Sequence, residues 1–378
     1  MEKSVFGNSH RLGILGGGQL GRMFIQEAIN YDVHVHIMAD EENVPSFSVC
    51  TSFTNGDITN YDDVLAFGKT LDVLTVEIEN VNVEALYELE KLGVKIFPQP
   101  RVLEIIKDKG LQKNFYKKND IPTSDFQLLD KSISAEILKN QLPFVQKLRT
   151  GGYDGKGVQV IKSTDDLSNA FDEPSIAEVL VPFVKELSVI VARNNSGETA
   201  VYPTVECEFN DANLVEFLFS PADITSEIEE KAKTLAIDVI NKLDMVGLLA
   251  VELFLLENGE LLVNEVAPRP HNSGHHTIEC NETSQFEQHL RSILDMPLGS
   301  TEIVRFGTMI NLIGSEDGKA QYLGINDAIR TSGVHIHLYG KEFSKKNRKM
   351  GHVTITANSI EEAIKKTKSI KHLIEIKG

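Results

Sequence analysis

Cysteine is scarce in this chain, and long apolar runs are absent. The 378 residues include three cysteines, Cys50, Cys207 and Cys280, with no Cys-x-x-Cys pair. Their odd number and wide spacing exclude a thiolate zinc site and suit a reducing cytosol. The first residues have no apolar signal core, and no stretch reaches the roughly 18 apolar residues that a membrane-spanning helix needs. We therefore expect a soluble, cytoplasmic protein.

Basic residues are also in deficit. Lys and Arg number 38 against 55 Asp and Glu, which gives a formal net charge of −17. Such a charge argues against a nucleic-acid backbone or an anionic membrane as the main partner, although it can also serve solubility alone. The chain length and a hydrophobic fraction of 41% allow several packed units with real cores. We expect neither nucleic acid nor a membrane as a partner.

Strand-like and helix-like segments alternate at the start of the chain. Residues 11–15, 33–37 and 71–76 predict strands, and residues 19–31 predict a helix after a glycine loop. This alternation is typical of a parallel sheet with helices on both faces. The run Pro98-Gln-Pro100 ends the pattern and marks a first boundary. The later segments are a helix at 102–118, strands at 143–148 and 158–161, a helix at 222–243, a hairpin at 248–266 and a small mixed segment after Pro297.

The stretch Arg149–Gly157 is rich in glycine and lies between two predicted strands. Glycines at 151, 152, 155 and 157 surround Lys156. Closely approaching backbone N–H groups and a lysine can form a cradle for phosphate. A Walker-A loop would need Ser or Thr after the lysine and then a helix, but here Gly157 and a strand follow. The pattern favours a flap over a nucleotide, with an ordinary glycine-rich hairpin as the alternative.

The predicted hairpin carries a pair of glutamates. Glu257-Asn258-Gly259 is a favoured turn sequence, and a two-residue loop at Asn258-Gly259 would place Glu252 opposite Glu265. Opposed carboxylates between apolar neighbours require a cation or a proton, and oxygen ligands suit Mg²⁺. Asn264 would point to the other face in a regular strand, but twist could bring its amide oxygen into the site. Two exposed glutamates on an edge hairpin are the alternative, and a three-residue loop would change the register.

The segment after the hairpin reads Ala267-Pro-Arg-Pro-His-Asn-Ser-Gly-His-His. Arg269, His271 and Asn272 follow the proposed metal site closely, so they could stabilise charge on a transferring phosphoryl group. The three histidines of this run could also suggest zinc. No cysteine or suitably spaced carboxylate completes a tetrahedral ligand set, so we disfavour that interpretation.

Two further patterns indicate phosphate. Residues 16–21 fit Gly-x-Gly-x-x-Gly between a strand and a helix, and Asp40 lies nineteen residues beyond Gly21. Alone, this would suggest a nicotinamide dehydrogenase, but such a loop can also hold the phosphate of a phosphoribosyl substrate. Near the end of the chain lies a basic run at 345–349, which contains Arg348, and Lys341 precedes this run. They could grip a phosphate, or the run could be a solvated loop.

The motifs at 16–23, 149–157, 264–275 and 309–314 together resemble the ATP-grasp superfamily, and within it the N5-carboxyaminoimidazole ribonucleotide synthetases. The resemblance implies a mixed α/β and α+β, ATP-grasp fold with four parts. These are a Rossmann-like N-terminal domain with a parallel sheet (1–101), a lid subdomain with the glycine-rich flap (102–182), a catalytic subdomain (183–300) and a small C-terminal domain (301–378).

The resemblance also implies an activity in purine biosynthesis. Enzymes of this family use ATP and bicarbonate to carboxylate 5-aminoimidazole ribonucleotide through carboxyphosphate, giving ADP and phosphate. The Asn-Ser-Gly-His run separates them from relatives that use formate or glycine. The alternatives are another ATP-grasp ligase, such as a formate-dependent glycinamide ribonucleotide transformylase, a nicotinamide dehydrogenase, or an inactive nucleotide-binding subunit. The family also implies a homodimer.

By resemblance, the site residues fall into four groups. Those for ATP are Lys109, Lys147, Gly152, Tyr153, Asp154, Gly155, Lys156, Gly157, Glu178, Val179, Leu180, Val181, Glu186, Phe209, Asn264 and Glu265. Those for the ribonucleotide and bicarbonate are Gly18, Gln19, Leu20, Glu77, Asn80, Lys341 and Arg348. Catalytic roles fall to Arg269, His271, Asn272, Tyr153 and Asp154, and Glu252 and Glu265 would bind two Mg²⁺ ions. Two positions depart from the family: Lys109 replaces a usual arginine, and Phe209 replaces a usual histidine.

Overall fold

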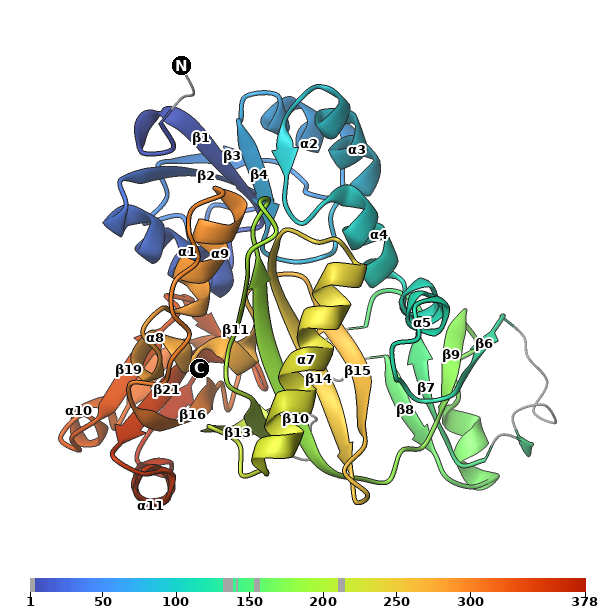
Figure 1. The fold of residues 1–378 in the computed structure, drawn as a ribbon. Coiled ribbons are helices and arrows are strands. Elements are labelled where there is room, and N and C mark those ends of the chain that lie inside the picture. The colour runs from blue at the N-terminus through green and yellow to red at the C-terminus, as the bar shows by residue number, and fades with distance from the viewer. Residues whose placement is uncertain (1–3, 132–138, 141, 153–156, 210–214) are drawn as a thin grey trace.

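The structure is a computed structural model, and it describes residues 4–131, 139–140, 142–152, 157–209 and 215–378. An N-terminal parallel sheet lies above a large central sheet, and a four-stranded sheet lies beside the central one (Figure 1). Four of the predicted site residues fall outside the described residues: Tyr153, Asp154, Gly155 and Lys156 of the glycine-rich stretch.

The N-terminal sheet is parallel throughout, as predicted. Its strand order is β3 (Ser52–Asn55), β2 (Val33–Ala39), β1 (Gly7–Leu15), β4 (Val73–Val76) and β5 (Lys95–Ile96). Its helices are α1 (Gln19–Asn30), α2 (Tyr61–Gly68) and α3 (Val83–Lys91). Leu12 of β1 packs in a cluster with Phe24 of α1, whereas Leu15 packs in a second cluster with Leu86 of α3. Alternation along the strand therefore buries both faces of the sheet.

The predicted helix over 102–118 is wrong, because two helices occupy that range. Helix α4 (Pro100–Lys107) ends at Asp108, whose backbone is extended, and α5 (Lys109–Lys118) begins directly after it. The Asp108 carboxylate accepts hydrogen bonds from Gly110 N (2.7 Å) and Leu111 N (3.1 Å). A side chain that caps the second helix competes with continuation of the first.

The lid sheet follows α5 and is antiparallel. Its order is β6 (Phe126–Leu129), β9 (Ser175–Val179), β7 (Phe144–Leu148) and β8 (Val158–Ile161), with a 3₁₀ turn, η1 (Asp165–Asn169), after β8. Strands β7 and β8 confirm the two strands predicted around the glycine-rich stretch. The described ends of that stretch, Arg149 and Gly157, therefore lie directly after β7 and directly before β8, which pair with each other.

The central sheet has nine strands. Its order is β15 (Leu261–Ala267), β14 (Gly247–Leu256), β10 (Phe183–Arg193), β12 (Val205–Phe209), β13 (Val215–Ser220), β16 (Phe306–Ile313), β21 (Lys349–Ala357) and β19 (Val334–Leu338), and β11 (Thr199–Val201) also pairs with β10. Strand β13 pairs with β16, so this sheet continues across residue 300. The division into four domains stays a prediction.

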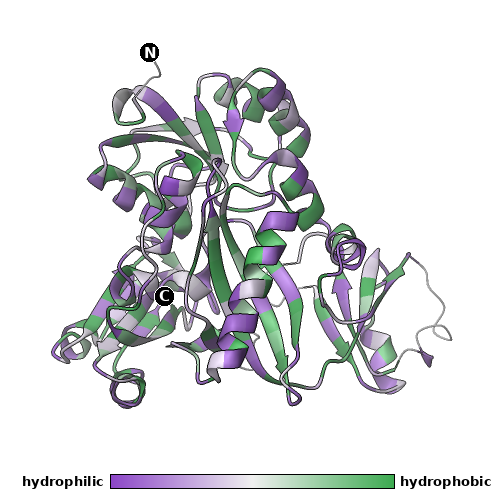
Figure 2. Cartoon of the chain, in the orientation of Figure 1, coloured by the Kyte–Doolittle hydropathy of each residue, from purple (hydrophilic) through white to green (hydrophobic). Residues whose placement is uncertain are grey.

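Helix α7 (Ser226–Lys242) covers the central sheet in front of β10 and β14 (Figure 1). It buries Ala232, Ala236, Val239 and Ile240, which recur at helical spacing on one face. Figure 2 shows the same pattern: hydrophobic residues along the strands and alternating purple and green along α7. The helix begins later than the predicted residue 222, because the Thr225 side chain accepts from Ile228 N and caps it.

Shorter elements complete the fold. They are η2 (Asn272–Gly274), α8 (Thr277–Cys280), α9 (Gln285–Ile293), β17 (Gly318–Lys319), β18 (Gln321–Leu323), α10 (Ile325–Ala328), β20 (Phe343–Ser344), α11 (Ile360–Ile370) and β22 (Glu375–Lys377). Over the described ranges, no helix has both the length and the apolar character needed to cross a membrane.

Candidate active site

The hairpin of β14 and β15 brings the two glutamates together. Glu252 pairs with Glu265, as predicted. The predicted two-residue loop is wrong: Leu256 N donates to Glu260 O (2.9 Å), so the turn contains residues 257–259. Gly259 adopts φ +82°, the left-handed conformation that such a turn requires. This longer loop shifts the strands by one residue near the turn.

A β-bulge at Asn264 then restores the register. Between the pairs Leu253–Val263 and Glu252–Glu265, strand β15 advances two residues while β14 advances one. A bulge re-aims the side chain of its additional residue. Here the amide oxygen of Asn264 accepts a hydrogen bond from Lys147 Nζ at 2.8 Å. Asn264 therefore lies beside the glutamate pair, and the cause is a bulge instead of the predicted twist.

Cations from the lid neutralise the carboxylates of this region. Lys109, the first residue of α5, donates to the Glu265 carboxylate. Lys147 of β7 lies 3.1 Å from Glu178 Oε1, and Lys113 of α5 lies 3.1 Å from Glu178 Oε2. Lys113 is buried and was not predicted from the sequence, because its partner is far along the chain. The Lys109–Glu265 ion pair and the Lys147–Asn264 hydrogen bond therefore join the lid to the hairpin, whereas the two pairs of Glu178 lie within the lid.

The pKa values show how unevenly the charges are compensated. Lys109 and Lys147 lower the pKa of Glu265, whereas burial and the charge of Glu265 raise the pKa of Glu252. Burial alone would raise the pKa of Glu178, but Lys147 and Lys113 outweigh it and lower that pKa to about 2. Burial and the neighbouring Glu265 thus make Glu252 resist ionisation, and a cation bound between the two carboxylates would relieve that resistance.

His271, which directly precedes the Asn-Ser-Gly-His run (272–275), lies beside the hairpin. Its Nε2 lies 3.6 Å from Glu252 Oε1, and its Nδ1 lies 2.9 Å from Ser273 Oγ. Asn272 and Asn311 of β16 exchange two amide hydrogen bonds of 2.9 Å. In the described part of the chain, no group of three or more His, Cys, Asp or Glu side chains could hold a metal ion by itself. His271, His275 and His276 form no such group.

Arg269 connects the hairpin to the N-terminal domain. Its guanidinium holds Glu79, which follows β4, with Nε–Oε1 at 3.0 Å and Nη2–Oε2 at 3.1 Å. The Glu79 carboxylate was not predicted, because it lies 190 residues away in sequence. Asn80 is exposed directly after it. The carboxyl end of β4 in the parallel sheet therefore faces the glutamate hairpin, and ligands of such sheets bind at the carboxyl ends of the strands.

The side chain of Glu77 lies at the N-terminus of α1. Its buried carboxylate accepts hydrogen bonds from Gly18 N and Leu20 N, the latter at 3.0 Å, and Gln19 lies between them. Burial raises the pKa of Glu77 despite these donors. A Cβ at Gly18 would lie 2.4 Å from Glu77 Oε1, which explains the glycine. The N–H groups that would hold a dinucleotide are bound to Glu77, which argues against the dehydrogenase alternative.

The remaining predicted residues lie around these groups. Val179 ends β9, and Leu180 and Val181 lie between it and β10 of the central sheet. Glu186 lies in β10, where burial raises its pKa to about 7 against the opposing effect of Lys147. Phe209 ends β12 and is half-buried. A Cβ at Gly157 would lie 3.2 Å from Gly152 Cα, so the two ends of the flap meet.

Lys341 and Arg348 differ in how they relate to the N-terminal domain. The segment of Lys341 contacts that domain, because Asn43 Nδ2 donates to Glu342 Oε2 at 3.0 Å. Lys341 itself donates to Lys349 O (2.7 Å). Arg348 Nη1 donates to Phe343 O (3.0 Å) within its own segment. Of the two segments, a hydrogen bond to the N-terminal domain is therefore seen for that of Lys341, at Asn43.

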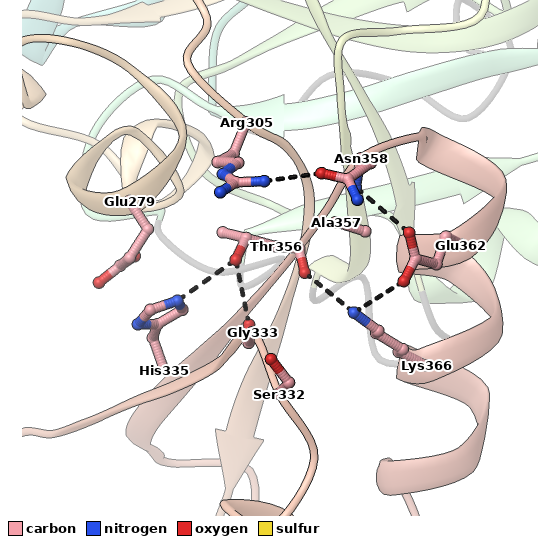
Figure 3. Close-up of a pocket in the computed structure, with 10 residues that line it drawn as sticks. All are labelled: Glu279, Arg305, Ser332, Gly333, His335, Thr356, Ala357, Asn358, Glu362 and Lys366. Carbon is pink, nitrogen blue, oxygen red and sulfur yellow. Dashed lines mark hydrogen bonds and ion pairs between the residues drawn. The ribbon is translucent and has the colours of Figure 1, made fainter.

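A hollow of about 700 Å³ lies in the C-terminal part, between β19, β21 and α11 (Figure 3). Its polar side chains bond to one another: Arg305 Nη1 to Asn358 Oδ1 (2.7 Å), Lys366 Nζ to Glu362 Oε1 (3.0 Å), and His335 Nε2 to Thr356 Oγ1 (3.3 Å). None of the predicted site residues lines it. This hollow is therefore separate from the glutamate hairpin.

Comparison with known proteins agrees with this arrangement. Three family models match the chain: a ribonucleotide synthetase preATP-grasp domain over residues 9–107, an ATP-grasp domain over 114–286, and a phosphoribosylaminoimidazole carboxylase C-terminal domain over 307–366. The phosphoribosylaminoimidazole carboxylase of Saccharomyces cerevisiae is 39% identical over 373 residues. That match covers 94% of this chain, and the chain spans only 65% of the length of the yeast protein.

Solved structures match over their whole length. The N5-carboxyaminoimidazole ribonucleotide synthetase of Thermotoga maritima is 38% identical, with a TM-score of 0.90 over 98% of this chain and 99% of that one. The N5-carboxyaminoimidazole synthase of Aspergillus clavatus, in complex with ADP and 5-aminoimidazole ribonucleotide, is 35% identical, with a TM-score of 0.87 over 97% and 98%. The ATP-grasp fold inferred from the sequence is thereby confirmed.

Proposed function

Because the chain belongs to the N5-carboxyaminoimidazole ribonucleotide synthetase family of ATP-grasp proteins, we propose that it is an ATP-dependent ligase of purine biosynthesis. Its reaction is the carboxylation of 5-aminoimidazole ribonucleotide with ATP and bicarbonate, which gives N5-carboxyaminoimidazole ribonucleotide, ADP and phosphate. The observation that carries the proposal is the opposed pair Glu252–Glu265, with lysines of the lid on one side and His271 on the other.

ATP binds between the lid and the central sheet in this proposal. Lys109 and Lys147 reach this space from α5 and β7 and supply positive charge for the phosphates. The connection Val179–Val181 supports the adenine, and Glu186 accepts from the ribose hydroxyls. Gly152 and Gly157 anchor the flap, and Tyr153, Asp154, Gly155 and Lys156 stay predictions for its tip, as does Phe209 for the nucleotide. Replacement of an arginine by Lys109 removes a bidentate grip on phosphate.

Mg²⁺ fits the hairpin. Glu252 and Glu265 face each other, and burial together with the charge of Glu265 raises the pKa of Glu252, so a cation between them would stabilise its ionised form. Mg²⁺ is commonly held by one or two carboxylates together with nucleotide phosphates, which agrees with two protein ligands here. We propose that Glu252 and Glu265, with the Asn264 amide oxygen beside them, hold two ions. Bound there, Mg²⁺ would neutralise charge on the phosphates.

The ribonucleotide binds between the hairpin and the N-terminal domain. Gln19 and Asn80 line this side, while Glu77 fixes Gly18 and Leu20 in place. Lys341 and Arg348 are proposed to bind the phosphate of the ribonucleotide. The Arg269–Glu79 ion pair fixes the guanidinium between the two substrates. The acceptor amine thereby approaches the γ-phosphate of ATP at the glutamate hairpin.

The proposed chemistry has two steps. A bicarbonate oxygen attacks the γ-phosphorus, the bond to ADP breaks, and carboxyphosphate forms. In one route, the exocyclic amine attacks the carboxyl carbon of carboxyphosphate and phosphate leaves. In the other, carboxyphosphate first breaks down to CO₂ and phosphate, and the amine attacks the CO₂. In both routes the amine loses a proton. Arg269 and His271 supply positive charge and hydrogen bonds where negative charge develops, and Asn272 orients the acceptor. Closure of the flap excludes water that would hydrolyse the intermediate.

Two further expectations belong to this proposal. The family resemblance implies a homodimer. Three free cysteines far apart in the sequence suit the reducing cytoplasm.

The test measures ADP release with each substrate omitted in turn. We expect rapid release only when 5-aminoimidazole ribonucleotide and bicarbonate are both present, with carboxylated product equal to ADP. Equal ADP release with and without the ribonucleotide would refute the proposal. Release supported by formate and glycinamide ribonucleotide would instead establish the transformylase alternative.

A further inference from the structure

Gln285, the first residue of α9, is fully buried and makes three side-chain hydrogen bonds, two to His271 and one to His275, at the two ends of the segment 271–275. Its Oε1 accepts from His271 N (2.9 Å), and its Nε2 donates to His271 O (2.8 Å). Nε2 also lies 3.0 Å from His275 Nδ1. One amide group therefore holds both backbone groups of His271 and the ring of His275.

Only a neutral amide side chain supplies this pattern. A carboxylate accepts but cannot donate to His271 O, and an apolar side chain does neither. Because Nε2 donates to His275 Nδ1, the His275 ring is held as the tautomer with its proton on Nε2. Burial lowers the pKa of His275 well below its usual range, which agrees with a neutral ring. The clasp therefore depends on the chemistry of glutamine as well as on its size.

Gly274 is fitted to the same side chain. A Cβ at Gly274 would lie 2.3 Å from Gln285 Oε1 and 2.6 Å from its Cδ. Contacts this short do not occur in folded proteins, so a larger residue at 274 would displace the clasp. The glycine of the Asn-Ser-Gly-His run and Gln285 therefore form one packed unit.

The clasp lies behind the imidazole of His271. The Nε2 atom of the ring lies 3.6 Å from Glu252 Oε1, and its Nδ1 atom lies 2.9 Å from Ser273 Oγ. Ser273 Oγ in turn lies 2.7 Å from Ser188 Oγ of β10. Ser273 and Ser188 fix the rotation of the ring, whereas Gln285 fixes the backbone that carries it. A displacement of about 1 Å at a reacting group can reduce a rate about a hundredfold.

We infer that Gln285 is a positioning residue, which holds His271 against Glu252 so that the imidazole meets the transferring phosphoryl group in the correct place. This inference rests on the proposed function. It predicts a defect in the chemical step, with substrate affinity largely retained, when the clasp is lost.

The chain offers a closely matched control in Gln288 of the same helix. Gln288 is also fully buried and also clasps one residue, since its Oε1 accepts from Gly299 N (2.8 Å) and its Nε2 donates to Gly299 O (2.8 Å). The changes Gln285→Met and Gln288→Met each remove a two-pronged backbone clasp from α9. They differ in which backbone is released.

The experiment measures kcat and both KM values for the two variants. We expect Gln285→Met to lower kcat by about ten- to a hundredfold with KM for ATP within about threefold, and Gln288→Met to leave kcat within about threefold. Equal kcat losses in the two variants, or a Gln285→Met kcat within threefold of wild type, would overturn the inference. An inactive wild-type protein would instead refute the proposed function.

A second variant guards against misfolding. Gln285→Glu keeps the shape and the acceptor for His271 N and loses the donor for His271 O, so we expect a kcat loss with KM for ATP retained. If both Gln285 variants fail to fold while Gln288→Met folds, the inference is wrong, because the glutamine then serves stability. A non-additive Gly274→Ala, Gln285→Met double variant, with kcat equal to that of Gln285→Met alone, would support one shared unit.

Discussion

The glutamate hairpin and the C-terminal hollow are both lined by charged side chains, but they differ in how those charges are compensated. In the hollow, Glu362 and Lys366 lie one helical turn apart on α11 and pair at 3.0 Å. In the hairpin, Glu252 faces Glu265, and the ammonium that reaches Glu265 comes from Lys109, 156 residues away. The first arrangement is local and balanced, whereas the second assembles like charges that only a distant element offsets.

This difference separates a structural surface from a functional one. A local ion pair on a helix adds a few tenths of a kcal/mol to stability and depends on no other element of the fold. The opposed carboxylates of Glu252 and Glu265 are only partly buried, with side chains 24% and 39% exposed, but they still repel one another across the hairpin. Such a pair indicates a ligand or a reaction that uses it. Size alone, about 700 Å³ for the hollow, is therefore a poorer criterion for a ligand site than like charges that the fold brings face to face.

The largest effect is expected for Glu265→Gln. Loss of one anionic Mg²⁺ ligand should lower kcat at least about a hundredfold, which is about 3 kcal/mol in the barrier. The fold should persist, because Glu252 remains to accept the charge of Lys109, and circular dichroism would check this. The matched change in the hollow, Glu362→Gln, should leave kcat unaltered. Near-normal turnover of Glu265→Gln at ordinary Mg²⁺ would remove the metal assignment.

Arg348 is an intermediate case that sharpens the comparison. Its guanidinium donates to Phe343 O in its own segment, as groups in the hollow do, yet the family resemblance gives it the phosphate of the ribonucleotide. If it binds that phosphate, Arg348→Ala should raise KM for the ribonucleotide about ten- to a hundredfold, since a charge-assisted hydrogen bond contributes about 1.5–3 kcal/mol.

Steady-state kinetics with each substrate varied would check this prediction. KM for ATP should change little, and Arg348→Lys should recover part of the loss. An unchanged ribonucleotide KM in Arg348→Ala would place Arg348 with the solvated, locally paired charges of the hollow.

The sequence predicted elements and pairings better than local irregularities. The parallel N-terminal sheet follows from alternating strand and helix patterns, which depend on neighbours in sequence. The Glu252–Glu265 pair was predicted correctly although the loop was wrong, because a three-residue turn and a bulge at Asn264 each shift the register by one residue and cancel. Neither irregularity has a clear sequence signal.

Partners that are distant in sequence could not be predicted. Glu79 gains its role from Arg269, Lys113 from Glu178, and Gln285 from the backbone of His271. Each of these residues would be an ordinary polar residue if read alone. Only the folded arrangement brings the two members of each pair into contact, and no periodicity records that contact.

A smaller, pH-dependent effect is expected for Glu186→Gln. Burial raises the pKa of Glu186 from 4.5 to about 7, so its neutral form stabilises the fold below pH 4.5, and that stability is lost as the pH rises through 7. The glutamine variant lacks this loss. Its melting temperature should therefore gain about 1–3 °C on wild type between pH 5 and pH 8. Thermal melts across this range would check the sign, and a parallel pH dependence in both proteins would contradict the assignment.

The smallest effect is expected for Lys366→Ala in the hollow. Lys366 pairs with the half-exposed Glu362 at 3.0 Å, and such an exposed helical pair contributes little to stability because water and salt screen it. The exposed pair Lys231–Glu227 on α7, at 2.7 Å and with the same i, i+4 spacing, gives the matched change Lys231→Ala. Both variants should melt within about 1–2 °C of wild type, and kcat and both KM values should stay unchanged. If Lys366→Ala alone raised a KM or lowered kcat, the locally balanced charges of the hollow would be functional, and like charges brought face to face would fail as the criterion that separates the two regions.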